Sequence, residues 1–421
     1  MNNKLNLGDD LYIKGRIGWR GLSKDEYLKE SDYRIINATA LEDGYVDWDN
    51  CGFISKERYD ESEEIMLKEG DILISKDGTL GKIGYVKNLK GKCTVASGVF
   101  VVRNTVPEKL NFDYLYHVLK SNVFKDFIRR NKANGSTINH LYQRDLEKFE
   151  IDLPSLDIQN KIANFLNLID EKISNNRKIV KKVNNITKTI YEQWFLKYNI
   201  PNFNMELVWS DDINKKIPND WRVLTVKDCI EHINTGLNPR QNFVFGDGNI
   251  KYVTVKNLTT EGTIDFSGCD VISNKVKEIV NKRSQLSKND ILFASIAPLG
   301  RCVIVEEEPL DWDINESVFA IRVKDNIVNP EYLYEYFMSD LFIKTAEHKS
   351  TGSIFSGLRI TALENMKVVI PDKKALELFS KTVNPLFKLK YNCEKDSQKL
   401  NEYNKYFIPA LLSGQIEFEK K

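Results

Sequence analysis

Apolar residues along the chain follow two kinds of spacing, which occur in the same order twice. Short apolar runs such as 70–86 and 95–102 are interrupted by Gly, Asn and Asp, which predicts β-strands joined by turns. A helical stretch at 112–130, and another at 331–347, lies near the end of each such region. A short apolar run then ends at a proline, and the apolar period changes from 2 to about 3.5.

After each proline, one apolar seam with a 4-3 alternation continues for three to four heptads, as is typical of coiled coils. The first seam runs through Ile169, Ile173, Asn176, Val180, Val183, Thr187, Ile190 and Trp194. The second seam runs through Phe379, Val383, Leu386, Lys390, Cys393, Ser397, Leu400, Asn404, Phe407 and Leu411. Each predicted helix has about 40 residues and would be roughly 60 Å long. We expect the two helices to pack as an antiparallel coiled coil, with a globular domain at either end.

The polar seam residues Asn176, Lys390, Ser397 and Asn404 have two interpretations. Buried polar residues in a seam fix the register and direction of the pairing. Alternatively, the true seam is shifted by one residue, and these side chains lie on its flank. The sequence leaves both interpretations open.

An internal repeat explains why the order occurs twice. Gly44 and Asp47 recur as Gly262 and Asp265, and the triplet 71–73 (Asp-Ile-Leu) recurs at 290–292. The two copies are therefore offset by nearly the same number of residues throughout. We predict an α+β fold built as a tandem repeat. Its parts are two globular domains at 1–153 and 201–370, each followed by a long helix, at 154–200 and 371–421.

Composition narrows the classes of protein that fit this organisation. The chain of 421 residues carries 61 Lys plus Arg against 60 Asp plus Glu, which excludes a chain that is basic throughout. Its basic residues concentrate in the helices, with 8 basic and 4 acidic residues in 154–200 and 10 and 7 in 371–421. Since no apolar stretch approaches the roughly 18 residues of a membrane helix, we expect a cytoplasmic protein with no membrane contact.

Motifs for metal binding, cofactor binding and catalysis were not found. The six Cys include no C-x-x-C pair, and a disulfide framework is not expected in a chain this long. The glycines at 78, 81 and 84 lack the spacing of a phosphate-binding P-loop and suit a tight hairpin turn better. The four His residues have no metalloprotease or triad context. We therefore expect no catalytic activity, no metal and no cofactor.

Four stretches carry a resemblance to a known family. They are Leu153-Pro154-Ser155-Leu156 with Gln159, Ile162 and Ile169-Asp170; Tyr191-Glu192-Gln193-Trp194-Phe195; Ile217-Pro218-Asn219-Asp220-Trp221; and Ala410-Leu411-Leu412-Ser413-Gly414-Gln415-Ile416. Together they resemble the helix boundaries and second-domain start of the specificity subunit of type I restriction-modification systems. Two departures are visible: no I-P-x-x-W lead-in precedes the first domain, and Pro371-Asp372-Lys373-Lys374 lacks the Gln.

The resemblance implies a non-catalytic DNA-binding subunit. Each globular domain would be a target-recognition domain that reads one half of a bipartite, asymmetric site in double-stranded DNA. The helices would set the gap between the halves and dock two methyltransferase (modification) subunits, with restriction (motor and nuclease) subunits as further partners. Two alternatives stay open: the recognition subunit of a methylation-only or other phage-defence system, and a coiled-coil scaffold whose end domains bind proteins or glycans.

Candidate DNA contacts are polar residues in corresponding loops of the two copies, because base edges are read by hydrogen-bonding side chains that reach the major groove. In the first copy they are Arg16, Trp19, Arg20, Lys76, Thr79, Lys82, Asn134, Ser136, Thr137 and Asn139. In the second copy they are Arg240, Gln241, Ser295, Arg301, Thr351, Ser353, Ser356 and Arg359. Some of these, such as Ser136 and Ser353, would equally suit turns with only local hydrogen bonds. Four lysines of the central helix, Lys178, Lys181, Lys182 and Lys188, face the DNA spacer, an acidic partner or solvent.

Overall fold

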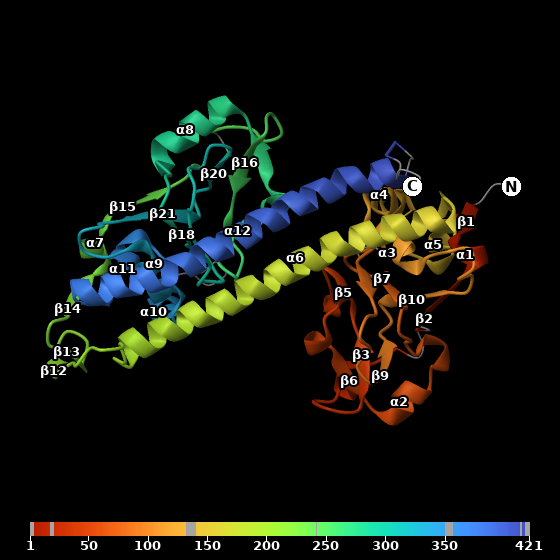
Figure 1. The fold of residues 1–421 in the computed structure, drawn as a ribbon, viewed down its shortest axis with the longest axis horizontal. Helices are drawn as coiled ribbons and strands as arrows, with labels where there is room; N and C mark the ends of the chain where they lie inside the picture. The colour runs from red at the N-terminus through yellow and green to blue at the C-terminus, as the bar shows by residue number, and fades with distance from the viewer. Residues whose placement is uncertain are drawn as a thin grey trace. The chain divides into compact units, whose positions relative to one another are not determined.

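The computed structural model describes residues 4–16, 21–131, 140–240, 242–349, 357–412 and 415–416 (Figure 1). The chain forms two compact units. Unit 1 consists of Met1–Lys172 together with Lys399–Lys421, and unit 2 consists of Ile173–Gln398. The two long helices, α6 (Leu156–Tyr191) and α12 (Lys373–Leu412), each contribute to both units.

Unit 1 is built on a six-stranded sheet and two smaller sheets. The large sheet has the order β2 (Leu11–Gly15), β10 (Val99–Asn104), β7 (Ile72–Ser75), β8 (Ile83–Tyr85), β5 (Gly44–Val46) and β4 (Leu41–Glu42). A three-stranded sheet has the order β6 (Gly52–Ile54), β3 (Tyr33–Ile36) and β9 (Lys92–Val95), and β1 (Lys4–Asn6) pairs with β11 (Glu150–Asp152). Fully buried Val, Ile and Leu side chains of β3, β7, β9 and β10 form a core beneath these strands.

Short helices connect and cover the strands of unit 1. They are α1 (Leu7–Asp10), α2 (Lys56–Asp60), α3 (Phe112–Lys120), α4 (Asn122–Asn131) and α5 (Gln143–Leu146). Helix α3 starts where the Asn111 side chain accepts a hydrogen bond from the Tyr114 amide, which satisfies one of the free amides of the first turn. All residues from Tyr114 to Leu119 are buried, so α3 is an interior helix between the sheet and α6.

Unit 2 repeats this plan. A four-stranded sheet has the order β15 (Ile230–Thr235), β21 (Val318–Val323), β18 (Ile291–Ala294) and β19 (Cys302–Ile304). The smaller sheets are β17 (Asp270–Ile272) with β16 (Ile250–Val253) and β20 (Trp312–Ile314), β14 (Arg222–Thr225) with β22 (Lys367–Ile370), and the hairpin β12 (Leu207–Ser210) with β13 (Lys215–Pro218). The helices are α7 (Val226–Cys229), α8 (Asn274–Ser284), α9 (Pro330–Met338), α10 (Asp340–Lys349) and α11 (Ile360–Glu364).

The structure confirms a mixed α and β fold with long helices, and corresponding elements carry the same contacts. In unit 1, Arg103 of β10 forms a bidentate ion pair with buried Asp71, the residue that precedes β7, with N–O distances of 2.8 and 2.7 Å. In unit 2, Arg322 of β21 does the same with buried Asp290, the residue that precedes β18, at 2.8 and 2.9 Å. The repeat seen in the sequence is therefore also a repeat of local structure.

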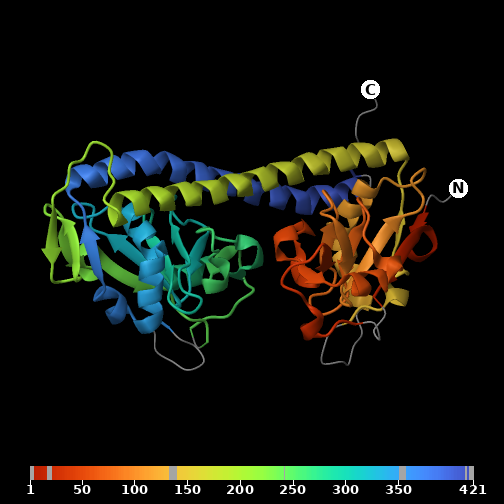
Figure 2. The same ribbon diagram turned by 90° about the horizontal axis from the view of Figure 1, so that it is seen from below.

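Helices α6 and α12 touch within each unit, and within unit 2 they lie side by side in both views (Figures 1 and 2). In unit 1 the rings of Phe165 and Phe407 are 5.8 Å apart. In unit 2 the Asn176 side-chain amide donates to the Cys393 carbonyl at 2.9 Å. Asn176 and Lys390 are both buried, so these two polar seam residues do not lie on an exposed flank. Among the described residues, no helix has the length and apolar character needed to span a membrane.

Candidate nucleic-acid interface

The hairpin loop between β7 and β8 carries three of the candidate DNA contacts of the first copy. Ser75 shapes this loop, because its hydroxyl accepts a hydrogen bond from the Lys82 amide at 2.8 Å and its carbonyl accepts one from the Gly81 amide at 2.9 Å. Within the loop Thr79 and Lys82 are exposed, and the ammonium of half-buried Lys76 lies 5.2 Å from the centre of the Phe100 ring. Thr79 and Lys82 therefore present polar side chains to solvent from a turn closed by hydrogen bonds to Ser75.

The corresponding loop of unit 2, between β18 and β19, has a different surface. Ser295 is only 6% exposed, and its hydroxyl donates to the Ser317 carbonyl at 2.8 Å. The Arg301 guanidinium is half-buried and donates to the Val255 carbonyl at 3.3 Å. Both side chains are thus largely engaged inside unit 2, in contrast to Thr79 and Lys82.

A second candidate segment is attached to each hairpin loop. The Leu141 amide donates to the Lys76 carbonyl in unit 1, and the Leu358 amide donates to the Ser295 carbonyl in unit 2. The segments that precede Leu141 and Leu358 contain the expected contacts Asn134, Ser136, Thr137, Asn139, Thr351, Ser353 and Ser356, which lie outside the described residues, as do Trp19, Arg20 and Gln241. The structure therefore brings the ends of these segments to the hairpin loops.

Arg16 differs most from its expected position. It is 2% exposed, and its guanidinium donates to the Val95 carbonyl at 3.1 Å, with the Ser62 and Thr94 hydroxyls each at 3.5 Å. Burial lowers the pKa of this guanidinium, with Arg58 nearby adding to the effect. This geometry argues against a direct base contact by Arg16 and gives it a structural role beneath β9.

Two further arginines of unit 2 remain available as candidates. Arg240 and Arg359 are exposed, and Arg359 stands at the start of α11 next to the loop that ends at Leu358. On α6, Lys178, Lys181 and Lys182 are exposed, whereas the Lys188 ammonium lies 3.0 Å from the Asp340 carboxylate of α10. Lys188 is therefore engaged with the globular part of its own unit.

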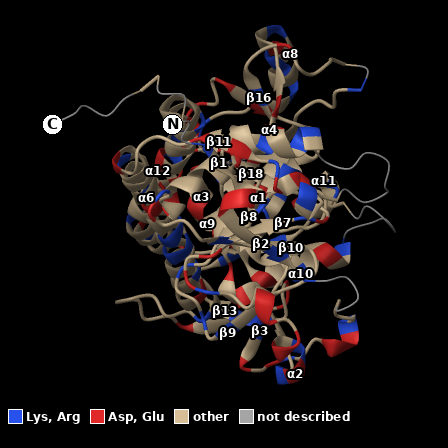
Figure 3. Ribbon diagram, turned by 90° about the vertical axis from the view of Figure 1, so that its right-hand side faces the viewer, with Lys and Arg blue, Asp and Glu red and all other residues tan. Residues whose placement is uncertain are grey.

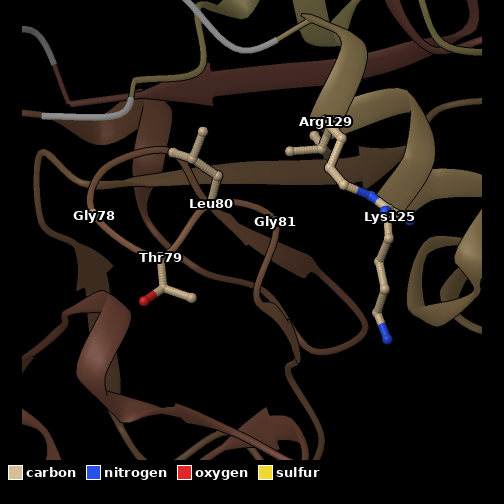
Figure 4. A pocket seen from close by; sticks show the side chains of 7 residues that line it. Gly78, Thr79, Leu80, Gly81, Lys125 and Arg129 are labelled. Atoms are coloured by element: carbon tan, nitrogen blue, oxygen red, sulfur yellow. The ribbon is translucent and has the colours of Figure 1, made fainter. Parts of the chain in front are cut away.

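The sequence did not point to a cavity that lies between the β7–β8 loop and helix α4. It has a volume of about 400 Å³ and is lined by Gly78, Thr79, Leu80, Gly81, Lys125, Ile128 and Arg129. Figure 4 shows the loop on one side and the side chains of Lys125 and Arg129 on the other. These two residues are four apart and so share one face of α4, a pattern visible in the sequence. The contact between this face and the hairpin loop, however, is visible only in the structure.

Charged residues of both signs are interspersed over the globular parts of the chain (Figure 3). Three buried ionisable groups of unit 2 have strongly shifted pKa values. Burial raises the pKa values of the Glu335 and Glu394 carboxyls to about 7, and burial lowers the pKa of the Lys390 ammonium to about 8. Among the described residues, no group of three or more His, Cys, Asp or Glu is placed to hold a metal ion.

Comparison with known proteins places these features in a family. The model of the "Type I restriction modification DNA specificity domain" matches residues 16–185 and 218–405, one match for each copy of the repeat. The "Type I restriction enzyme MjaIX specificity subunit" of Methanocaldococcus jannaschii is 26% identical over 364 residues, which cover 85% of this chain and 82% of that protein. The "Type I restriction enzyme EcoBI specificity subunit" of Escherichia coli is 25% identical over 326 residues, covering 73% and 66%.

A solved structure has the same fold. The crystal structure of the S subunit of a type I restriction-modification system from M. genitalium aligns with a TM-score of 0.53 at 16% identity. The alignment covers 99% of this chain and 96% of that one.

Proposed function

Because the chain belongs to the family of type I restriction-modification DNA specificity domains, we propose that it is the sequence-recognition subunit of such a system. The observation that carries the proposal is that the family match falls once on each copy of the repeat, and each match contains one globular domain and one long helix. Each globular domain reads one half of a bipartite site in double-stranded DNA. The subunit itself is non-catalytic, and its place of action is the cytoplasm, where the DNA is.

The two half-sites differ, because the two sets of candidate contacts differ. The exposed Thr79 of the first copy corresponds to Pro298 in the second, and half-buried Lys76 corresponds to the buried Ser295. A proline cannot donate from its backbone nitrogen, and a buried serine cannot reach a base edge as a lysine can. Two readers with different donors recognise an asymmetric sequence.

Helices α6 and α12 form an antiparallel coiled coil that sets the gap between the half-sites. Support comes from the order of the contacts. Phe165 and Asn176 of α6 meet Phe407 and Cys393 of α12, and Trp194, in the helical turn Glu192–Leu196 that follows α6, meets Phe379, so one number rises as the other falls. A fixed separation selects half-sites at a fixed phase of the DNA helix, as the spacing of dimeric repressors does. Joining two weak readers also raises affinity through their effective concentration.

The helices also dock two methyltransferase subunits. Exposed apolar side chains on α6 and α12 support this role, since Leu168, Ile186 and Leu389 are 66%, 47% and 44% exposed. Apolar side chains in this setting favour contact with a protein partner. A repeat of two copies offers the same kind of surface twice, which suits two methyltransferase subunits. Restriction subunits complete the complex in a system that also cleaves.

The test is methylation mapping. Co-expression of the chain with its methyltransferase subunit in a host without adenine methylation should give methyl-adenine at one two-part motif with a fixed gap. Replacement Arg359→Ala should relax or abolish recognition of one half only, because Arg359 is an exposed candidate contact of unit 2. The matched control is Arg222→Ala, another exposed arginine, on β14 of the same unit, which should leave the motif unchanged. Methylation without any two-part motif would refute the proposal.

A further inference from the structure

The cavity between the β7–β8 loop and α4 is lined by backbone amides that have no acceptor among the described residues. The backbone amides of Gly78, Thr79 and Leu80 donate no hydrogen bond to any residue that the structure describes. Gly78 and Gly81 have φ values of 69° and 74°, a left-handed conformation that glycine adopts without strain and that lets the chain turn tightly here. Successive amides in such a turn form a concave site that suits an anion.

The α4 side of the cavity supplies positive charge. Lys125 is exposed and forms no ion pair with a described residue, and Arg129 is exposed and pairs only with Asp126 of its own helix. The nearest carboxylate of the loop, Asp77, is hydrogen-bonded to His140. The charges that face the cavity are therefore predominantly positive.

The corresponding place in unit 2 lacks these donors. Thr79 is replaced by Pro298, which has no amide hydrogen, and Lys125 and Arg129 of α4 correspond to Ile343 and Glu347 of α10. The Ile343 side chain lies against the loop, since a Cβ added at Gly300 would be 2.7 Å from its Cδ1. The two copies thus share the loop and the helix but differ in the charge and the donors between them.

We propose that this cavity binds a phosphate of the DNA backbone in the half-site read by unit 1, and that unit 2 has no corresponding phosphate site. The inference rests on the proposed function and deepens it. Amides, an ammonium and a guanidinium that line one cavity are the kinds of donor that hold a phosphate. Such a contact fixes the position of unit 1 on the duplex, while the loop side chains beside it read bases.

The test compares two single-charge variants of one helix in the complex with the methyltransferase subunits. Lys125→Ala removes a cavity cation, and Arg130→Ala removes an exposed cation of α4 that does not line the cavity. The probe is a DNA duplex that contains the motif recognised by the wild-type complex in methylation mapping. Its binding is measured at salt concentrations between 50 and 200 mM. Losing one phosphate contact should make the slope of log K against log salt shallower by about 0.9. The ratio of wild-type to variant affinity for the duplex should therefore fall roughly threefold from the lowest to the highest salt concentration.

Lys125→Ala should weaken binding and lower the slope, and phosphate ethylation should no longer interfere at one position of the unit 1 half-site. An affinity and slope equal to wild type, or the same loss in Arg130→Ala, would overturn the site. A second arm tests whether the cavity is a site for free phosphate, by comparing inorganic phosphate with chloride at equal ionic strength. If inorganic phosphate binds to the wild-type complex while Lys125→Ala leaves the DNA affinity unchanged, the assignment to a DNA phosphate is overturned. Failure of the wild-type complex to bind the duplex would refute the proposed function itself.

Discussion

His117 and Glu335 occupy the same position in the two copies, and their burial predicts opposite responses to pH. His117 on α3 is 2% exposed, and its Nε2 donates to the Asn167 side-chain oxygen at 2.9 Å, since the Asn167 amide nitrogen donates to Asp113. Burial lowers the pKa of His117 to about 4. Glu335 on α9 is 4% exposed, and burial raises its pKa to about 7 although Thr187 and Lys390 favour the charged form.

The sign of each effect follows from which state binds the proton. As the pH falls below the ordinary histidine pKa of 6.5 towards 4, His117 binds a proton in unfolded unit 1 but stays neutral in folded unit 1, so unit 1 loses stability. As the pH rises from the ordinary glutamate pKa of 4.5 through 7, the unfolded unit 2 releases a proton that the folded unit retains, so unit 2 loses stability. Each difference of about 2.5 pKa units corresponds to about 3 kcal/mol at most.

Other groups near Glu335 do not reverse this expectation. Glu394 also has its pKa raised to about 7 and therefore acts with the same sign. Lys390, with its pKa lowered to about 8, contributes its own pH dependence above pH 8. The window from pH 5 to 7 is thus the one in which the two units should respond in opposite directions.

Hydrogen exchange of α3 and α9, corrected for intrinsic exchange rates, measures the two responses in one sample. Between pH 5 and 7 the protection of α3 should rise and that of α9 should fall. Glu335→Gln should reduce the fall in α9 and leave α3 unchanged, because Gln fills the same space without titrating while Glu394 still titrates. Protection that rises in both helices, or a fall in α9 that is undiminished in Glu335→Gln, would refute the reasoning.

Three other changes have expected outcomes. Asp290→Asn should destabilise unit 2 by roughly 3 kcal/mol in urea unfolding, because it leaves Arg322 without its buried counter-ion; a loss below 1 kcal/mol would contradict this role. Asn176→Leu should stabilise the α6–α12 contact by about 1 kcal/mol in the same assay, because the buried Asn176 Oδ1 has no partner among the described residues, and destabilisation would show that its two donated hydrogen bonds dominate. One heptad added at matched positions of both long helices should lengthen the gap in the methylated motif by about 3 base pairs, from 1.5 Å per helical residue and 3.4 Å per base pair. An unchanged gap would refute the proposal that the helices set the distance between the half-sites.

Much of the architecture could be predicted from the spacing of residues alone. The offset of the repeat relates α3 to α9 and α4 to α10, and the 3.5-residue period located both long helices. Local chemistry explains this success, since Asn111 and Asn329 each cap the helix that follows through the same amide contact. Patterns that depend on neighbours in sequence are visible in the sequence.

The site depends on neighbours in space and was predicted less well. Arg16 lies close in sequence to glycines and Trp19, a pattern that suggests an exposed loop. Its guanidinium is nevertheless buried, where it donates a hydrogen bond to the Val95 carbonyl of a strand far away in the sequence. Lys125 and Arg129 have the spacing of a solvated helix face, and only the packing of α4 beside the β7–β8 loop makes them part of a cavity. The spacing of residues within one helix or strand does not predict which other helix or strand packs against it.

Lys390 shows how the two copies keep a contact while changing the residues that make it. In unit 1 the Lys120 ammonium, from α3, donates to the Tyr116 hydroxyl at 3.0 Å and to Asp170 of α6 at 2.6 Å. In unit 2 the tyrosine at the same repeat position, Tyr334, receives a hydrogen bond at 3.2 Å from Lys390 of α12. The ammonium comes from the globular domain in one copy and from the long helix in the other, so the chemistry of the joint is kept although the sequence position is not. In both copies an ammonium bonded to the equivalent tyrosine therefore links the globular domain to a long helix, through Asp170 of α6 in unit 1 and through Lys390 itself in unit 2, and this link leaves the loops free to differ.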